Sequence, residues 1–196
     1  MASAGRLREC PGGHASGVPG RHAVCNSLGP RVADTTYRME LTLPFDYQAI
    51  ERILPHRYPF LLVDRVTEFE VDRRIVGIKN ISGNERYLWQ RPGERPVLPP
   101  TILTEAVAQV GAILILAKPE NREKLIYFMG IERVRYRKPV HPGDVVVIEA
   151  RVRRLRSRMG VLEGVARVDD VVVAEGTMTF ALGPRSNEDR AGSSDA

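Results

Sequence analysis

One segment, residues 101–118, restricts the possible folds of this chain more than any other, because it combines helical length with apolar side chains around its whole circumference. A helix that is apolar on every side must be buried on every side. Its uncharged part, Val107–Ala117, is too short to span a bilayer. Glu105 and Gln109 are the polar residues in its middle, and a spacing of four places them on one face. We therefore expect a central helix that the rest of the domain encloses.

Strand-like segments stand on both sides of this helix in the sequence. The predicted strands cover residues 60–70, 74–81, 126–136, 145–156, 160–168 and 171–182. A short helix is expected at 47–54, and the proline-rich stretch 86–100 is expected to be irregular. The paired aspartates in Val168–Val171 predict a tight hairpin turn. Two strands, one long helix and four further strands predict an α+β fold, in which an antiparallel sheet wraps around the helix.

The composition fits one globular domain, with 43% hydrophobic and 27% charged residues in a chain of 196. We place this domain at residues 39–183, between an N-terminal extension at 1–38, expected to be disordered, and a flexible tail at 184–196. The extension carries arginines and few acids, which also suits an organelle transit peptide. It shows neither an amphipathic helical pattern nor a secretory apolar core, so we favour a non-folding extension and a cytoplasmic protein.

Both cysteines, Cys10 and Cys25, lie in that extension, so neither a disulfide framework nor a cysteine-based zinc site is expected. We predict no metal and no redox cofactor. The net charge of +5 suits an acidic partner. Nucleic acid is not the predicted partner, because no aromatic residues alternate with the basic ones.

Glu105 is the residue in which chemistry is most expected. A lone carboxylate in so apolar a helix must be hydrogen-bonded, paired, protonated or turned towards a cavity. It can therefore be a general acid or base, or one half of a structural salt bridge to an arginine within 86–95. The residues alone leave both interpretations open.

Several motifs resemble those of bacterial (3R)-hydroxyacyl-[acyl-carrier-protein] dehydratases of the FabZ type. The similar motifs are Ile53–Val66 (ILPHRYPFLLVDRV), Gly77–Asn80 (GIKN), Asn84–Glu85, Pro96–Pro99 (PVLP), Glu105–Gln109 (EAVAQ) and Lys138–Asp144 (KPVHPGD). The resemblance covers about residues 45–183. It implies a hot-dog fold, in which a curved antiparallel sheet wraps one long helix, and a homodimer or hexamer. It also implies a lyase of fatty acid or polyketide-type biosynthesis, whose substrate is a thioester of an acyl carrier protein.

In that family a loop histidine removes the proton α to the thioester, and a helix glutamate of the other subunit, matched by Glu105, assists departure of the 3-hydroxyl. A backbone amide at the helix start binds the thioester oxygen. This chain departs from the pattern twice. The histidine position holds Arg91, or Gln90 if the alignment shifts by one residue, and the amide position holds Pro100, which has no N–H.

Arg91 stays protonated near neutral pH and cannot serve as a base. It could pair with Glu105 instead. Losing a positioned base costs on the order of 10²–10⁴ in rate, so we expect an acyl-thioester-binding protein whose dehydration is impaired when it acts alone. One alternative is the non-catalytic subunit of a heterodimer with a histidine-bearing paralogue, and another is a thioesterase that uses Glu105. An imidazole in contact with Glu105 would contradict the expectation of an inert scaffold.

The resemblance marks further candidates for the substrate tunnel, namely Tyr58, Trp89, Pro100 and Gln109. Tyr58 either gates acyl access or packs in a proline-bracketed corner, and Trp89 either plugs the pocket or anchors its loop. For His56 we favour the packing corner, and for His141 a surface turn.

The densest basic stretch is the candidate surface for docking an acidic carrier protein. Its arginines are Arg151, Arg153, Arg154, Arg156 and Arg158. Such charges mainly raise the rate of encounter. A solvated strand edge is the simpler interpretation of the same residues.

Overall fold

The structure is a computed structural model that describes residues 42–156 and 158–184. Its elements are α1 (Tyr47–Ile53), β1 (Arg65–Glu70), β2 (Arg74–Asn80), α2 (Pro100–Leu116), the 3-10 turn η1 (Pro119–Asn121), β3 (Lys124–Tyr136), β4 (Val145–Arg156), β5 (Met159–Val168) and β6 (Val171–Pro184). The six strands form one antiparallel sheet in the order β1-β2-β4-β5-β6-β3. This confirms the predicted α+β arrangement.

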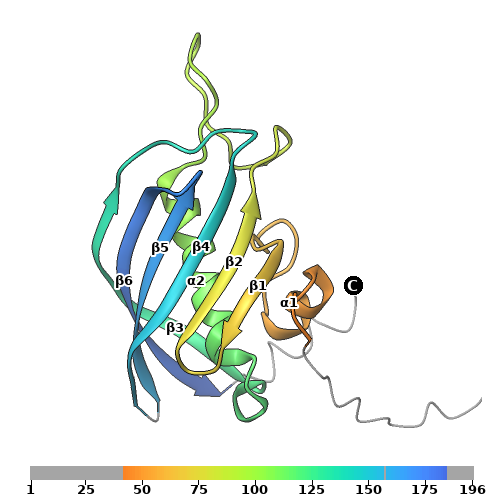
Figure 1. The fold of residues 1–196 in the computed structure, drawn as a ribbon, viewed down its shortest axis with the longest axis vertical. Helices are drawn as coiled ribbons and strands as arrows, with labels where there is room; N and C mark the ends of the chain where they lie inside the picture. The colour runs from red at the N-terminus through yellow and green to blue at the C-terminus, as the bar shows by residue number, and fades with distance from the viewer. Residues whose placement is uncertain (1–41, 157, 185–196) are drawn as a thin grey trace, which may run out of the picture. The chain divides into compact units, whose positions relative to one another are not determined.

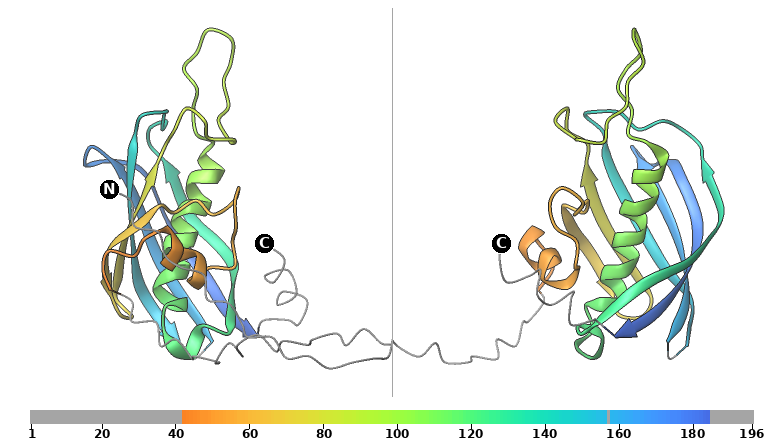
Figure 2. Two further views of the ribbon diagram at one scale, coloured as in Figure 1. Left: turned by 90° about the vertical axis from the view of Figure 1, so that its right-hand side faces the viewer. Right: turned by 180° about the vertical axis from the view of Figure 1, so that it is seen from behind.

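The sheet curves around α2, which lies along its inner face (Figures 1 and 2). From Ala106 to Leu116 every residue of α2 is buried, as its uniformly apolar sequence predicted. The packing is close enough to exclude a side chain at Gly164 of β5, because a Cβ there would lie 2.2 Å from a methyl carbon of Val107. A glycine at this position therefore lets the sheet approach the helix.

The β5–β6 hairpin forms as predicted at residues 168–171. Asp169 and Asp170 both have positive φ, at 47° and 62°. Two consecutive residues of this kind match the right-handed twist of the strands that they join.

The predicted strand at 60–70 is wrong in its first half, since β1 begins only at Arg65. At Phe60 and Leu62 the backbone bonds to a side chain of α2, and only at Asp64, whose N–H donates to Ile78 O at 2.9 Å, does it reach β2. Leu62 N–H donates to Gln109 Oε1 at 2.9 Å, and Phe60 O accepts from Gln109 Nε2 at 2.8 Å.

The stretch predicted to be irregular contains a narrow hairpin that rises beyond the ends of the strands (yellow-green in Figures 1 and 2). A two-residue bridge pairs Trp89 with Val97, and Gln90 Nε2 donates to Glu94 O at 2.8 Å. At its base, His141 Nδ1 lies 2.7 Å from Pro96 O. The hairpin is thus held to the domain at its base.

The extension at 1–38 lies outside the described residues, as does the tail beyond Pro184. The predicted limits of the domain therefore stay predictions. Among the helices that the structure describes, none has the length and apolar character needed to cross a membrane.

Candidate active site

Glu105 lies in the second turn of α2, where its side chain is 29% exposed, directly before the part of the helix that is buried throughout, Ala106–Leu116. Gln109, one turn later, donates from Nε2 to Glu105 Oε1 at 3.0 Å. The predicted placement of the two side chains on one face of the helix is therefore confirmed.

Gln109 is nearly inaccessible to solvent, at 1% exposure, yet its amide is fully used. Its oxygen accepts from Leu62 N–H, and its nitrogen donates to both Phe60 O and Glu105. A buried amide with these partners is stabilising, because none of its polar atoms is left unpaired. Gln109 thus joins the helix, the segment after α1 and the Glu105 carboxylate.

His56 approaches Glu105 from the segment that follows α1. Its Nε2 lies 3.5 Å from Glu105 Oε1, and its side chain is also 29% exposed. Its other ring nitrogen, Nδ1, is buried and has no hydrogen-bond partner among the described residues. The prediction of a simple packing corner at His56 missed this contact. The contact also meets the condition set above against an inert scaffold.

Burial lowers the pKa of His56 below the ordinary value of histidine. The nearby Glu105 carboxylate opposes this shift, and the Arg57 guanidinium adds to it. Burial has this effect because it disfavours the charged imidazolium. The imidazole is therefore neutral near pH 7 and able to accept a proton.

A cavity of about 120 Å³ opens beside this pair. It lies between α2, the segment after α1, and β3. Its walls are Leu54, Pro55, His56, Glu105, Gln109, Ala112, Leu116, Ile126 and Phe128. One end of the cavity is polar, where His56, Glu105 and Gln109 meet, and the rest is apolar. This arrangement suits a ligand with a polar reacting group and a hydrocarbon chain.

Within one chain Arg91 does not pair with Glu105, so the pair suggested by the sequence stays a prediction. Its guanidinium lies over the ring of Trp89, 4.9 Å from the ring centroid, and 3.9 Å from Glu94 Oε1. These contacts all lie within the projecting hairpin. The arginine therefore stays on its own hairpin, and His56 takes the place next to the carboxylate.

The other predicted tunnel residues lie outside this cavity. Tyr58 is 77% exposed and Trp89 is 50% exposed. Pro100, the first residue of α2, lines a different hollow together with Leu103, Tyr136 and Lys138. Of the four candidates, the structure brings only Gln109 to Glu105.

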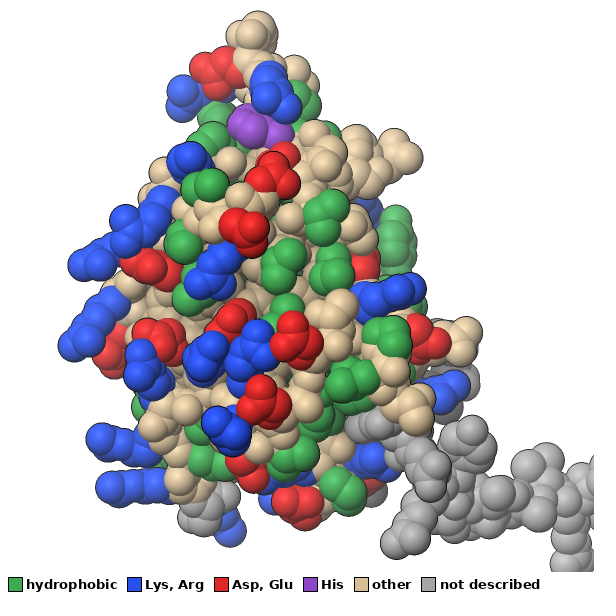
Figure 3. All heavy atoms as spheres, viewed as in Figure 1, with side chains coloured by type: hydrophobic (Ala, Val, Ile, Leu, Met, Phe, Trp, Pro, Cys, Tyr) green, Lys and Arg blue, Asp and Glu red, His purple; other side chains and the backbone are tan. Residues whose placement is uncertain are grey.

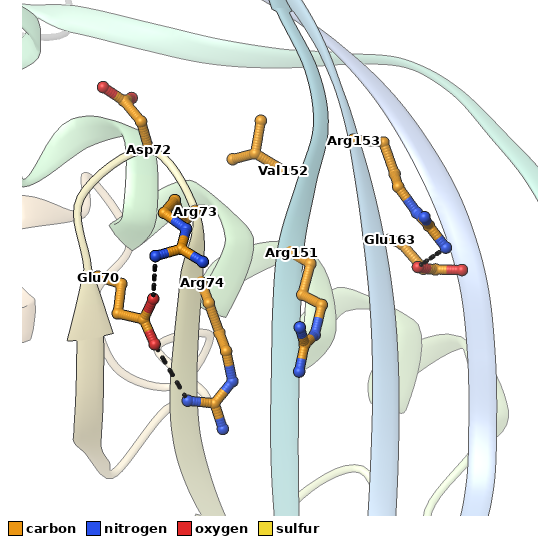
Figure 4. A pocket seen from close by; sticks show the side chains of 8 residues that line it. All are labelled: Glu70, Asp72, Arg73, Arg74, Arg151, Val152, Arg153 and Glu163. Carbon is orange, nitrogen blue, oxygen red and sulfur yellow. Dashed lines mark ion pairs between the residues drawn. The ribbon is translucent and has the colours of Figure 1, made fainter.

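The predicted docking arginines lie along β4 and its turn into β5. Basic and acidic side chains are mixed over the face of the domain shown in Figure 3. Arg151 contacts Glu149, and Arg153 Nη2 lies 2.5 Å from Glu163 Oε2. Both arginines line a charged hollow that also holds Glu70, Asp72, Arg73 and Arg74 (Figure 4). Their charge is therefore largely balanced by neighbouring carboxylates.

Arg154, Arg156 and Arg158 are exposed, and no ion pair involves them within residues 42–156 and 158–184. They form the unbalanced part of the basic stretch. In the same part of the chain no group of three or more histidine, cysteine or acidic side chains could hold a metal ion.

A family model described as a FabA-like domain matches residues 54–177, which include His56, Glu105 and Gln109. A 3-hydroxyacyl-[acyl-carrier-protein] dehydratase FabZ of Geobacillus sp. (strain WCH70) is 47% identical over 143 residues, which are 73% of this chain and 99% of that relative. The FabZ of Moorella thermoacetica is 49% identical over 140 residues, which are 71% of this chain and 98% of that relative. This chain belongs to the FabZ-type dehydratase family. The family catalyses the dehydration of 3-hydroxyacyl thioesters in fatty acid biosynthesis.

Solved structures show that the FabZ-type chain has the hot-dog fold. The dehydratase heterocomplex ApeI:P from Xenorhabdus doucetiae superposes with a TM-score of 0.61 at 19% identity, covering 80% of this chain and 100% of the other. Cj0977, a virulence protein from Campylobacter jejuni, superposes with a TM-score of 0.55 at 16% identity, covering 76% and 99%. At these identities the likeness concerns the fold alone.

Proposed function

We propose that this protein binds a 3-hydroxyacyl thioester and removes water from it with His56 and Glu105 of one chain, at a rate below that of an enzyme with a loop histidine. The observation that carries the proposal is the 3.5 Å contact between His56 Nε2 and Glu105 Oε1 at the mouth of a cavity with apolar walls. Family membership supplies the substrate class.

His56 and Glu105 can take up the proton that the substrate loses and return it to the leaving hydroxyl group, so the reaction needs no other proton donor. Neutral His56 takes the proton from the carbon α to the thioester and becomes an imidazolium, which the Glu105 carboxylate stabilises. The same proton then passes to the departing 3-hydroxyl, either directly or through Glu105, and leaves as water. The carbon–oxygen bond breaks, the double bond forms, and the pair returns to its starting state.

Two features support a slow reaction. Arg91 cannot accept a proton, and it lies away from Glu105. Pro100 begins α2 without an N–H, so the donor that would hold the thioester oxygen is missing there. Loss of one such donor costs on the order of 10²–10³ in rate. The proposed activity is therefore impaired but not absent.

We also propose that the substrate arrives on an acyl carrier protein, and that the exposed arginines 154, 156 and 158 attract that acidic partner. Family membership supports this, and so does the lack of an ion pair to any of these three side chains within residues 42–156 and 158–184. The cytoplasmic location predicted from the sequence stays a prediction.

A second copy of the chain is the proposed partner of β3. At the opposite edge of the sheet, β1 is partly covered, because Phe45 and Val66 exchange two backbone hydrogen bonds of 3.0 Å. Within the described residues the 13-residue edge strand β3 has no such bridge on its outer side, and it exposes Tyr127, Met129 and Ile131 by 49%, 64% and 51%. An open edge with exposed apolar side chains is a template for pairing with another chain.

The experiment that tests the function uses the purified full chain and a 3-hydroxyacyl thioester of acyl carrier protein, with formation of the enoyl product as the readout. We expect slow dehydration by the native protein. His56→Gln and Glu105→Gln should each lower it by about 10²-fold. His141→Gln is the matched control, because His141 contacts Pro96 and lies outside the cavity. It should stay within about twofold of the native rate.

Unchanged activity in His56→Gln would reject the proposed base. A native rate equal to that of a relative with a loop histidine would reject the impairment. Activity that requires an added histidine-bearing paralogue would assign the chain to a heterodimer. Release of free thiol without enoyl product, lost in Glu105→Gln, would make it a thioesterase.

A further inference from the structure

The imidazole of His56 is held by packing and not by hydrogen bonds. Its Nδ1 is buried without a partner among the described residues, and its Nε2 has only the 3.5 Å contact with Glu105. Rotation about the bond that carries an imidazole ring meets broad, shallow minima. Something other than a hydrogen bond must therefore keep Nε2 directed at the carboxylate.

Phe60 contacts two other rings. Its centroid is 6.1 Å from that of His56 and 6.0 Å from that of Tyr87, and the planes of Phe60 and Tyr87 meet edge to face at 79°. Both separations lie within the range of favourable aromatic pairs. Phe60 therefore links the ring of Tyr87 to that of His56.

The backbone beside Phe60 is fixed from two directions. Phe60 O accepts from Gln109 Nε2 at 2.8 Å, and Pro59 O accepts from the Tyr87 hydroxyl at 3.4 Å. The same Gln109 nitrogen donates to Glu105. His56, Phe60, Gln109 and Glu105 therefore form a closed ring of contacts, so that a shift of Phe60 would disturb both members of the catalytic pair.

Tyr87 is itself anchored by a buried ion pair. Lys79 Nζ lies 2.7 Å from Glu85 Oε2, and the two side chains are 5% and 14% exposed. Leu88 N–H donates to Glu85 O at 3.3 Å, so the backbone around Tyr87 is tied to the same residue. Removal of either partner of such a pair would leave an uncompensated buried charge.

We propose that Phe60 is a positioning residue that directs the imidazole of His56 towards Glu105, and that Tyr87 braces Phe60. The inference rests on the proposed function, because it assigns the residues that prepare the His56–Glu105 pair for catalysis. Phe60 acts only through His56. It sets the geometry in which the α-proton meets Nε2.

The test combines kinetics with NMR titration of His56, whose signal is identified by its loss in His56→Gln. Phe60→Leu should lower kcat about tenfold, with KM within about twofold, because positioning affects the transition state more than binding. The same variant should raise the pKa of His56 towards the ordinary value, since burial is the main cause of its lowering. The charged groups that face His56 are Glu105 from α2 and Arg57, the residue after His56 in the chain. Arg57 forms an ion pair with Glu51. All three charged side chains remain in the variant.

Phe60→Tyr keeps the ring and should restore both kcat and the pKa. Tyr87→Leu leaves Phe60 in place without its brace and should give the same changes at about a third of the size. If Phe60→Leu does not fold, the result for Tyr87→Leu decides whether Phe60 positions His56. An unchanged kcat and an unchanged His56 pKa in Phe60→Leu or Tyr87→Leu would overturn the inference.

Failure of the proposed function gives a different result. His56→Gln would then leave the activity intact, while the pKa of His56 in Phe60→Leu would still report on positioning. If His56→Gln does lower the activity, a pKa change in Phe60→Leu without any change in kcat would make Phe60 a structural neighbour only and would overturn its positioning role.

Discussion

His56 and Glu105 differ in how firmly each is held. Glu105 is fixed by a hydrogen bond from Gln109, whereas His56 depends on the rings around it and on burial of Nδ1. A neutral, partly buried imidazole next to a carboxylate can accept a proton and then be stabilised as the cation. The residue that carries the proposed chemistry is therefore positioned by packing and by its contact with Glu105, without a hydrogen bond to Nδ1 among the described residues.

The lowered pKa of His56 should also appear in the stability of the protein. The unfolded chain binds a proton at His56 near the ordinary value, whereas the folded chain binds it only at lower pH. Between these two values the unfolded state carries more protons, so stability falls as the pH drops through this window. We expect the native protein to lose more free energy of unfolding between pH 7.5 and pH 5.5 than His56→Gln does, as measured by urea denaturation.

His141→Gln provides the comparison for this experiment, since it removes another histidine from the described domain. If the free energy of unfolding changed with pH in the same way for the native protein and for His56→Gln, His56 would not be buried as a neutral group.

At the scale of elements, the turn from β4 to β5 combines two kinds of arginine. Arg151 and Arg153 have carboxylate partners, whereas Arg154, Arg156 and Arg158 have none within the described ranges. Only the second group adds net positive charge that a partner could meet. The predicted docking stretch thus divides into a balanced and an unbalanced part.

Replacing Arg154, Arg156 and Arg158 together with alanine should lower kcat/KM for a carrier-protein substrate by about tenfold at low salt, through slower encounter. The effect should fade as salt screens the charges. The coenzyme A thioester of the same acyl group serves as the control and should react at an unchanged rate. Equal losses with both substrates would contradict docking at this turn.

At the scale of the whole molecule, the sheet has one partly covered edge and, within the described residues, one open edge. The open edge, β3, also forms a wall of the cavity through Ile126 and Phe128. A second copy paired along β3 would therefore lie close to the proposed site. We therefore expect assembly along this shared strand to affect the proposed activity.

Ile131→Asp should convert the protein from a multiple of its 21.9 kDa chain mass to a single chain in light scattering, because a charge would be buried in the paired edge. Val71→Asp provides a matched exposed apolar site in the turn between β1 and β2, and it should leave the assembly intact. A native protein that is already a single chain would contradict the proposed pairing.

Patterns within one element were enough to predict much of the fold. Residues 101–118 had to be a buried helix because they are apolar on every side, and Glu105 had to meet Gln109 because four residues make about one turn. The β5–β6 turn followed from its paired aspartates in the same way. Local spacing decides such contacts, since both partners belong to one short stretch of backbone.

Contacts between distant segments needed the tertiary structure. The sequence places Arg91 at the position of a missing base, whereas within one chain the side chain that meets Glu105 is His56, and Arg91 contacts Glu94 on its own hairpin. Residues 60–64 have the side chains of a strand, yet Gln109 takes the backbone hydrogen bonds of Phe60 and Leu62. The sequence by itself determined the enclosed helix and its carboxylate. Only the folded chain decided which side chain faces that carboxylate, because this depends on how segments far apart in sequence pack together.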